Sequence, residues 1–491
     1  MHDPRLKHVI VVGGGLAGLA AAETLALPLE RVATATQPAC TVTLVEPTGR
    51  LGGVVATVRQ DGWLVERSAD SFFAGRPEAI AMVERLGLRS ELVGVDPRVR
   101  RALIYRDGRL FPVPAGFRLL APGRISSIVT SPLLSLRGKL RLLAERFVPR
   151  RTADLATVSS DESLEQFAVR RLGREAFERL VQPLVSGIWT ADPAQLSMAA
   201  ACPEFFEMER RFGSLSSGER MRLKHTGGED EATGARYGQF VTLKSGMETL
   251  PTVLGERLHC AGVRRITARA QRLVQTESGW ELFLQAVGNG SHAAEVPPQS
   301  LLCDAVVLAV PSGVAAQLLA AVDQPVAQEL AGLQYAGSAI VSLGFSQSDV
   351  QHPLDAAGLV VARTAGRKIL AISFSSSKFP ARAPLGAVLL RAFVGGALDP
   401  TTALLDDSRL QSLVIAEVSA LLGIRVPPQF VQIDRWAGAM PQYHVGHVQR
   451  IERINRRLAG IAGVALAGAA YEGVGIPQVI ASGQAAAARL V

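Results

Sequence analysis

The feature that most constrains this chain is a glycine-rich turn close to its N-terminus. The apolar, β-branched run Val9–Val12 leads directly into three glycines with the spacing G-x-G-x-x-G, which are Gly13, Gly15 and Gly18. Between a strand and a helix, such glycines permit a tight turn, a close backbone approach to a diphosphate, and close helix–strand packing. The free N–H groups of the helix N-terminus favour negative charge. We therefore predict a dinucleotide site here, with Leu16 and Ala17 in the first helical turn.

The sequence around the turn supplies the expected context. A helical pattern runs from Leu16 to about Leu27, and the run Thr41–Val45 predicts a second strand that ends at Glu46. An acidic residue at this place binds a ribose hydroxyl. It usually lies roughly 20 residues beyond the glycines, and we interpret the excess here as a loop over Pro28–Ala39. Strand, helix and acid together favour a dinucleotide over a merely glycine-rich turn.

Composition limits the class of protein. The 491 residues are 48% hydrophobic and 20% charged, which is typical of a globular chain with more than one domain. The net charge of +8 comes almost entirely from arginine, which suits a polyanionic ligand or an anionic membrane surface as well as a GC-rich genome. The cysteines are too scattered for a disulfide framework or a zinc ribbon, and they are Cys40, Cys202, Cys260 and Cys303. We expect a cytoplasmic location, with no metal, nucleic acid, signal peptide or membrane-spanning segment.

A second glycine turn follows Glu46. Arg50, Gly52 and Gly53 precede an alternating pattern over 54–58 and 63–65 that predicts a hairpin. This G-R-x-G-G turn resembles that of the flavoprotein group that contains amine oxidases, phytoene desaturases and porphyrinogen oxidases. In that group the arginine and the paired glycines lie along the diphosphate and isoalloxazine ring of FAD. An ordinary hairpin turn is the alternative interpretation.

The remainder of the chain predicts a helical region and then a second sheet. Helices dominate from Arg76 to about Ser217, and Phe117–Phe147 mixes apolar with basic residues. Such helices lie on membranes or form an ordinary domain surface. Apolar runs then predict strands at 338–345, 357–361, 369–374 and 388–393, and a helix at 404–422. The chain ends with a predicted strand at 464–467 and a glycine-rich turn that enters an alanine-rich helix.

Several stretches resemble one family in particular, the oxygen-dependent protoporphyrinogen and coproporphyrinogen oxidases. In the family's order they are DGWLVERSADSFF, PLVSGIWTADPAQLSMAAACPEFFEME, RFGSL, GQFVTLKSGMETLP, WAGAMPQYHVGH and AGAAYEGVGIPQVIASGQ. The resemblance implies oxidation of coproporphyrinogen III or protoporphyrinogen IX in haem biosynthesis, with FAD as cofactor. Electrons pass to oxygen, and hydrogen peroxide is released. No cysteine follows Cys303, so we expect the FAD to be non-covalent.

The resemblance also assigns site residues. Those that it places at FAD are Gly13, Gly15, Leu16, Ala17, Gly18, Glu46, Arg50, Gly52, Gly53, Val263, Gly468, Gly473, Val474, Gly475 and Ile476. The family's propionate-binding arginine falls nearest Arg101, and Ser68 and Ala69 replace the family's glycine–proline pair. No side chain is assigned a catalytic role, because the flavin carries the chemistry. His444 and His447 are predicted to be packed or hydrogen-bonded structural residues.

These observations predict an α/β fold with a discontinuous, Rossmann-like FAD-binding domain. We expect that domain to comprise residues 1–75, 235–310 and 430–491, with a mainly helical subdomain at 76–217 and a mixed-sheet substrate domain at 311–429. An amine oxidase or carotenoid desaturase, and a non-catalytic flavin- or porphyrin-binding protein, remain alternatives. A homodimer, and contact of the helical subdomain with the inner face of the membrane, also remain open.

Overall fold

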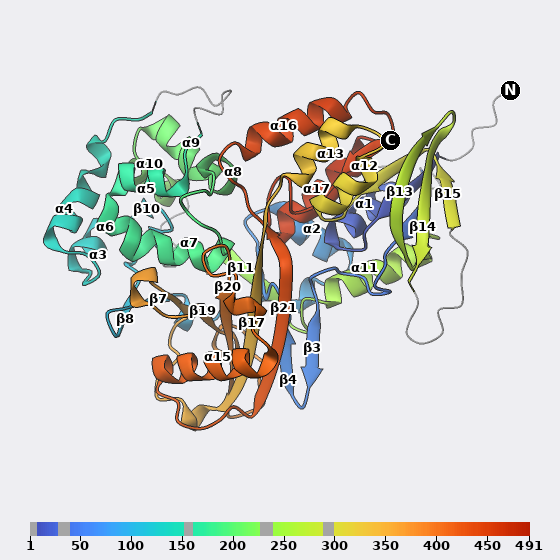
Figure 1. The fold of residues 1–491 in the computed structure, drawn as a ribbon. Helices are drawn as coiled ribbons and strands as arrows, with labels where there is room; N and C mark the ends of the chain where they lie inside the picture. The colour runs from blue at the N-terminus through green and yellow to red at the C-terminus, as the bar shows by residue number, and fades with distance from the viewer. Residues whose placement is uncertain (1–6, 28–39, 152–160, 226–238, 288–298) are drawn as a thin grey trace.

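The computed structural model describes residues 7–27, 40–151, 161–225, 239–287 and 299–491 (Figure 1). The predicted loop over Pro28–Ala39 lies outside the described residues. Within them the chain has an α/β fold with one parallel sheet, one large mixed sheet and a separate group of helices, which confirms the predicted fold class.

The parallel sheet has five strands in the order β12-β2-β1-β16-β22. Its strands come from distant parts of the chain, and they are β1 (Lys7–Val12), β2 (Cys40–Val45), β12 (Arg264–Ile266), β16 (Ala305–Leu308) and β22 (Val464–Leu466). Central β1 pairs with both neighbours, so that Val9 lies opposite Val42 and Ala305. Because both faces of the sheet are covered, β16, β22 and the Val9–Val12 part of β1 are continuous buried apolar runs rather than alternating ones.

Helices α1 (Leu16–Ala26) and α17 (Ile476–Ala488) pack together against one face of this sheet. They approach closely because Gly483 lacks a side chain: a Cβ atom there would lie 2.1 Å from the Ala17 carbonyl oxygen. The other face is covered by α12 (Ser312–Leu319) and by a small sheet of β13 (Ala268–Thr276), β14 (Gly279–Ala286) and β15 (Gln299–Cys303). Segments from the two ends of the described chain therefore share one core (Figure 1).

The mixed sheet has seven strands in the order β21-β17-β20-β19-β18-β7-β8. They are β7 (Ala102–Arg106), β8 (Arg109–Pro112), β17 (Tyr335–Ser346), β18 (Gly358–Val361), β19 (Ile369–Phe374), β20 (Ala387–Gly395) and β21 (Phe430–Pro441). The β18–β7 pair is parallel and the other pairs are antiparallel. Helix α15 (Asp407–Leu422) covers one face, where it packs on Leu390, Ala392 and Val394. Side chains alternate along a strand, so Arg391 and Phe393 point to the opposite face.

A helical region packs on that opposite face. Its elements are α3 (Ile125–Thr130), α4 (Leu136–Leu143), η3 (Ala144–Phe147), α5 (Leu164–Leu172), α6 (Arg174–Ala176), a π-helical turn (Phe177–Val181), α7 (Gln182–Trp189), α8 (Met198–Ala201), α9 (Pro203–Phe212) and α10 (Leu215–His225). Its core extends onto the mixed sheet through Ala102, Val360 and Ala371. No helix among the described residues is long and apolar enough to cross a bilayer.

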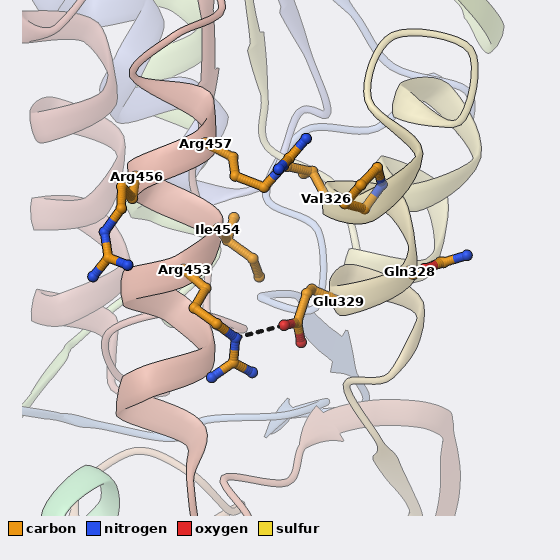
Figure 2. Close-up of a pocket in the computed structure, with 8 residues that line it drawn as sticks. Val326, Gln328, Glu329, Arg453, Ile454, Arg456 and Arg457 are labelled. Carbon is orange, nitrogen blue, oxygen red and sulfur yellow. Dashed lines mark hydrogen bonds and ion pairs between the residues drawn. The ribbon is translucent and has the colours of Figure 1, made fainter. Parts of the chain in front are cut away.

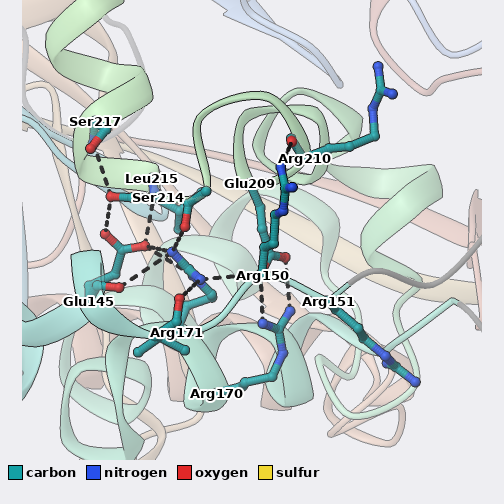
Figure 3. Close-up of polar contacts among 12 residues, drawn as sticks. Glu145, Arg150, Arg151, Arg170, Arg171, Glu209, Arg210, Ser214, Leu215 and Ser217 are labelled. Atoms are coloured by element: carbon teal, nitrogen blue, oxygen red, sulfur yellow. Dashed lines mark hydrogen bonds and ion pairs between the residues drawn. The ribbon is translucent and has the colours of Figure 1, made fainter.

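A buried ion pair ties four elements of the helical region together (Figure 3). The side chains of Arg171 on α5 and Glu145 on η3 are both fully buried, and Arg171 Nε donates to Glu145 Oε1 at 3.0 Å. Arg171 also pairs with Glu209 of α9 at 3.3 Å, and the Leu215 N–H at the start of α10 donates to Glu145 at 2.9 Å. Burial opposes ionisation of Glu145, but Arg171 and the hydrogen bonds hold its pKa below the usual value. The network therefore holds the carboxylate charged inside the core.

The remaining described elements connect these parts. The strands are β3 (Thr57–Gln60), β4 (Trp63–Glu66), β5 (Phe72–Phe73), β6 (Leu92–Gly94), β9 (Phe117–Arg118), β10 (Ala121–Pro122) and β11 (Phe240–Leu243). The helices are α2 (Pro77–Arg85), α11 (Thr249–Cys260), α13 (Gln324–Ala331), α14 (Ser375–Lys378), α16 (His447–Leu458) and short 3₁₀ turns. Strands β3 and β4 form the predicted hairpin.

Candidate functional site

Two of the three motif glycines in the first turn, Gly13 and Gly18, have no room for a side chain. Gly13 has φ +108°, and a Cβ atom on it would lie 2.3 Å from the Ala309 carbonyl oxygen. A Cβ atom on Gly18 would lie 1.9 Å from the Gly13 carbonyl oxygen. Gly15 differs, because the nearest atom to its Cβ position is Gly53 Cα at 3.9 Å. This open backbone at the N-terminus of α1 is what a diphosphate requires.

Glu46 lies beside this turn, directly after β2. Its Oε2 accepts the Gly14 N–H at 2.7 Å, and its Oε1 accepts the Thr48 N–H at 2.9 Å. The Glu46 N–H donates to the Ile266 carbonyl at 3.0 Å, which anchors the residue to β12. A carboxylate offers about four lone-pair sites, so the oriented group keeps acceptor capacity for a ribose hydroxyl.

The second glycine turn packs directly on the first. The Gly52 N–H donates to the Gly14 carbonyl at 2.8 Å, and both Gly52 and Gly53 have positive φ, +105° and +60°. The Arg50 side chain is bonded to the carbonyls of its own loop, including that of Val55 at 2.9 Å. Arg50 Nη1 also lies 3.6 Å from Glu248 Oε1. The structure therefore brings the two glycine turns, Glu46 and Arg50 together.

The C-terminal turn is linked to the first turn through the α1–α17 contact. Gly468 follows β22 and donates its N–H to Ser482 Oγ at 3.0 Å. Gly473 has φ +144°, and Gly475 is the N-cap of α17. Ile476 shares a buried cluster with Leu16 of α1. Val474 instead packs against the core of the helical region, so this turn lies between the parallel sheet and the helices.

Tyr443 and His447 hold the backbone that leads into this turn. The Tyr443 hydroxyl donates to the Ala469 carbonyl, and His447 Nε2 lies 3.0 Å from the Tyr471 carbonyl oxygen. Their rings stack with centroids 4.1 Å apart. Burial lowers the pKa of His447 to about 4, so the ring is neutral at pH 7 and donates to this carbonyl. These contacts agree with the structural role predicted for His447.

Two predicted site residues lie apart from the rest. Val263 stands just before β12, at the end of the strand away from Ile266 and Glu46. Arg101 donates to the Asp355 carbonyl through Nε at 2.8 Å and forms an ion pair with the Asp355 carboxylate. Its neighbour Ala102 faces the helical core, so by alternation the Arg101 side chain points to the other face of the sheet.

Sequence reasoning missed a charged group next to the second glycine turn. Lys378 Nζ donates to Asp70 Oδ2 at 2.6 Å, and Arg391 Nη1 lies 3.3 Å from the same oxygen. The one sequence signal was a charged residue inside the apolar strand VLLRAFVG. It could not reveal Asp70 as the partner, because the two residues meet only when β20 packs against the segment after β4.

A separate cavity of about 500 Å³ lies between α13 and α16 (Figure 2). Arginines of α16 line one side, where Arg453 Nε pairs with Glu329 at 2.6 Å and Arg457 pairs with Asp323 at 2.9 Å. None of the residues that line it is a predicted cofactor contact. The cavity is therefore distinct from the glycine turns.

Comparisons with known proteins agree with the geometry of the turns. A family model of flavin containing amine oxidoreductases matches residues 16–491. Coproporphyrinogen III oxidase of Bacillus subtilis (strain 168) is 34% identical over 488 residues, which cover 98% of this chain and 97% of that protein. Chloroplastic protoporphyrinogen oxidase of Nicotiana tabacum is 29% identical over 459 residues, which cover 89% and 77%. A crystal structure from Exiguobacterium sp. 255-15, provisionally named a protoporphyrinogen oxidase, matches with a TM-score of 0.81 at 30% identity and covers 99% of this chain and 98% of its own.

Proposed function

The chain belongs to the family of flavin-containing amine oxidoreductases, and on that premise we propose that it oxidises coproporphyrinogen III to the porphyrin with FAD and molecular oxygen. The observation that carries the proposal is the cradle of glycine turns in a chain that is similar over almost its whole length to a coproporphyrinogen III oxidase. Coproporphyrinogen III is favoured over protoporphyrinogen IX because the bacterial relative is more similar and more fully covered than the tobacco protein. The reaction is a step of haem biosynthesis.

The chain's own residues bind and orient the cofactor. The N-terminus of α1 offers free N–H groups to the diphosphate, and Glu46 accepts a ribose hydroxyl. No cysteine follows Cys303, so the C-terminal turn offers no thiol and the FAD is held non-covalently. When bound, FAD accepts electrons from the substrate and passes them to oxygen.

An apolar wall orients the substrate. Val474 and Phe393 are partly buried and pack on a cluster that contains Val360 and Ala371, on the face of the mixed sheet turned toward the helices. This wall joins the C-terminal turn to the sheet. The porphyrinogen ring, which is puckered because its four bridging carbons are saturated, is shielded from water against this wall and held at the flavin, which is the contribution that binding makes to such a reaction.

The test is oxidation of coproporphyrinogen III by the purified holoprotein. Porphyrin fluorescence should appear with oxygen uptake and hydrogen peroxide, faster than with protoporphyrinogen IX and without any turnover of a polyamine. Gly18→Ala should bind less FAD, because its Cβ would lie 1.9 Å from the Gly13 carbonyl oxygen. Its rate of porphyrinogen oxidation should fall by at least about tenfold. Gly313→Ala is the matched control, because nothing lies within 4 Å of its Cβ position.

Two outcomes would contradict the proposal. Bound FAD without porphyrin formation above the uncatalysed rate would favour a non-catalytic flavin- or porphyrin-binding protein. Turnover of an amine instead of either porphyrinogen would favour an amine oxidase.

The helical region supports a second proposal, a peripheral contact with an anionic membrane surface. Leu136, Leu140 and Phe147 are 74%, 62% and 72% exposed along α4 and η3. The exposed arginines Arg137 and Arg146 lie among them. Exposed apolar residues with interleaved basic ones are typical of helices that lie in the headgroup layer. The substrate side of the molecule would then face the membrane from the cytoplasm.

A further inference from the structure

Three charged side chains meet at the segment that follows β4: Asp70 belongs to this segment, and Lys378 and Arg391 contact it. Lys378 and Arg391 both contact Asp70 Oδ2, at 2.6 Å and 3.3 Å. All three side chains are at least about four-fifths buried, with Arg391 almost completely so. Among the described residues, Arg391 Nε is a buried donor without a hydrogen-bond partner. This group is called the Asp70 cluster below.

The Asp70 cluster is coupled to the second glycine turn through Ser68. The Ser68 hydroxyl donates to the Val54 carbonyl at 2.6 Å, and Val54 directly follows Gly53. The Ser68 carbonyl accepts from Arg391 Nη2. Serine thus replaces the family's glycine here with a hydroxyl that ties the segment to the hairpin. The cluster is therefore joined through Ser68 to the residue that directly follows the second glycine turn.

The charges in the Asp70 cluster do not cancel. Burial opposes ionisation of Asp70, yet Lys378 and Arg391 hold the pKa of this carboxyl well below its usual value, so it is ionised. One carboxylate then faces two cations. The neighbouring Glu66 lies 3.6 Å from its own cation, Arg382, and burial raises the pKa of this carboxyl, so it does not offset the charge of the Asp70 cluster. A net positive charge in a buried site is poorly screened by water and salt.

We propose that this uncompensated positive charge raises the reduction potential of the bound flavin, with Lys378 and Arg391 as positioning residues that act through the Ser68–Asp70 backbone. The inference rests on the proposed function, because it requires FAD at the glycine turns. The reduced cofactor carries more negative charge than the oxidised one, so a nearby cation stabilises the reduced state. At an effective dielectric constant of about 20, one unit charge about 12 Å from the flavin alters such an equilibrium by about tenfold, which is about 30 mV for a two-electron couple.

The experiment is a reductive titration of the bound flavin in charge variants of the holoprotein. Lys378→Met makes the Asp70 cluster neutral, so the potential should fall by about 30 mV, a tenfold change. Lys378→Arg keeps the charge and should keep the wild-type potential. The double variant Asp70→Asn with Lys378→Met removes one charge of each sign, leaves Arg391, and should also return to the wild-type value.

Lys368→Met is the matched control, because Lys368 forms an exposed pair with Asp399 in the same part of the chain. Its potential should not change. A wild-type potential in FAD-loaded Lys378→Met would overturn the inference. So would a double variant that stays as low as the single one, because loss of packing rather than charge would then explain the shift. If the wild-type protein binds no FAD, the proposed function itself is contradicted. If the variants bind FAD normally and their potential does not change, only the inference about the Asp70 cluster is contradicted.

Discussion

His447 shows how burial fixes the ionisation state of one residue at the site. Only 4% of its surface is exposed, and its ring is packed on Tyr443 while Nε2 contacts the Tyr471 carbonyl. A buried imidazole is more easily kept neutral than charged, because the imidazolium loses its hydration. The residue therefore supports the C-terminal turn as a neutral hydrogen-bond donor.

We predict that this neutral histidine makes stability depend on pH. The folded pKa of about 4 lies below the ordinary value of 6.5, so the unfolded chain takes up a proton first as the pH falls. The contribution is complete above about pH 6.5 and is lost as the pH falls toward 4. Between pH 7 and pH 5 the free energy of unfolding should fall by about 2 kcal/mol more in the wild type than in His447→Gln. Denaturant unfolding at the two pH values measures this difference, and equal losses in both proteins would refute it.

Residues with a local role were predictable from the sequence, and residues with distant partners were not. Gly13 and Gly18 could be predicted because the spacing G-x-G-x-x-G lies within six consecutive residues. Lys378 and Asp70 acquire their role only from each other, more than 300 positions apart. Arg101 was predicted from its place in the family pattern, and in the structure its side chain pairs with Asp355.

At the scale of elements, hydrophobic pattern identified strands and helices well but not their neighbours. The predicted strands at 369–374 and 388–393 appear as β19 and β20, and the predicted helix at 404–422 appears as α15 with a later start at Asp407. Strands β7 and β8 join the mixed sheet although they lie within the predicted helical range 76–217. Strand β21 joins it from the predicted cofactor range 430–491. Pairing between strands so distant in sequence leaves no local trace.

The junction of α5, η3, α9 and α10 depends on one buried arginine. Arg171→Met removes the cation that faces Glu145, so it leaves this buried carboxylate without its ionic partner, whereas Glu209 keeps its pair with Arg170 at 2.7 Å. We expect this variant to lose about 3–5 kcal/mol of unfolding free energy. Urea unfolding followed by intrinsic fluorescence measures the loss.

Arg174→Met is the control for this junction, because Arg174 is more than half exposed and forms only surface pairs. It should cost less than about 1 kcal/mol. Adding Glu145→Gln to Arg171→Met should restore part of the stability. Equal losses in Arg171→Met and Arg174→Met would show that the buried pair contributes nothing.

At the scale of the whole molecule, the helical region forms one outer edge, with α3 and α4 farthest from the parallel sheet (Figure 1). The exposed Leu136, Leu140 and Phe147 lie at this edge. Each large apolar side chain that is inserted into the headgroup layer contributes roughly 1.5–3 kcal/mol to the free energy of membrane binding. If this edge binds a membrane, replacing these side chains should therefore weaken the binding measurably.

We predict that Leu140→Glu combined with Phe147→Glu weakens binding to vesicles that contain phosphatidylglycerol by more than tenfold. Co-sedimentation with vesicles at low and moderate salt measures the affinity, which should also fall as salt rises. Leu404→Glu is the control, since Leu404 is 76% exposed on a turn of the mixed-sheet part. Binding that is equally weakened by Leu404→Glu, or absent in the wild type, would contradict the proposal.

The close contact between Gly483 and Ala17 has a consequence for the time at which the core between α1 and α17 can form. Strand β1 and helix α1 are made more than 400 residues before β22 and α17, which complete the same sheet and core. The early segment therefore keeps one flank of its apolar surface uncovered until β22 and α17 have been made. The core around the first glycine turn closes only then.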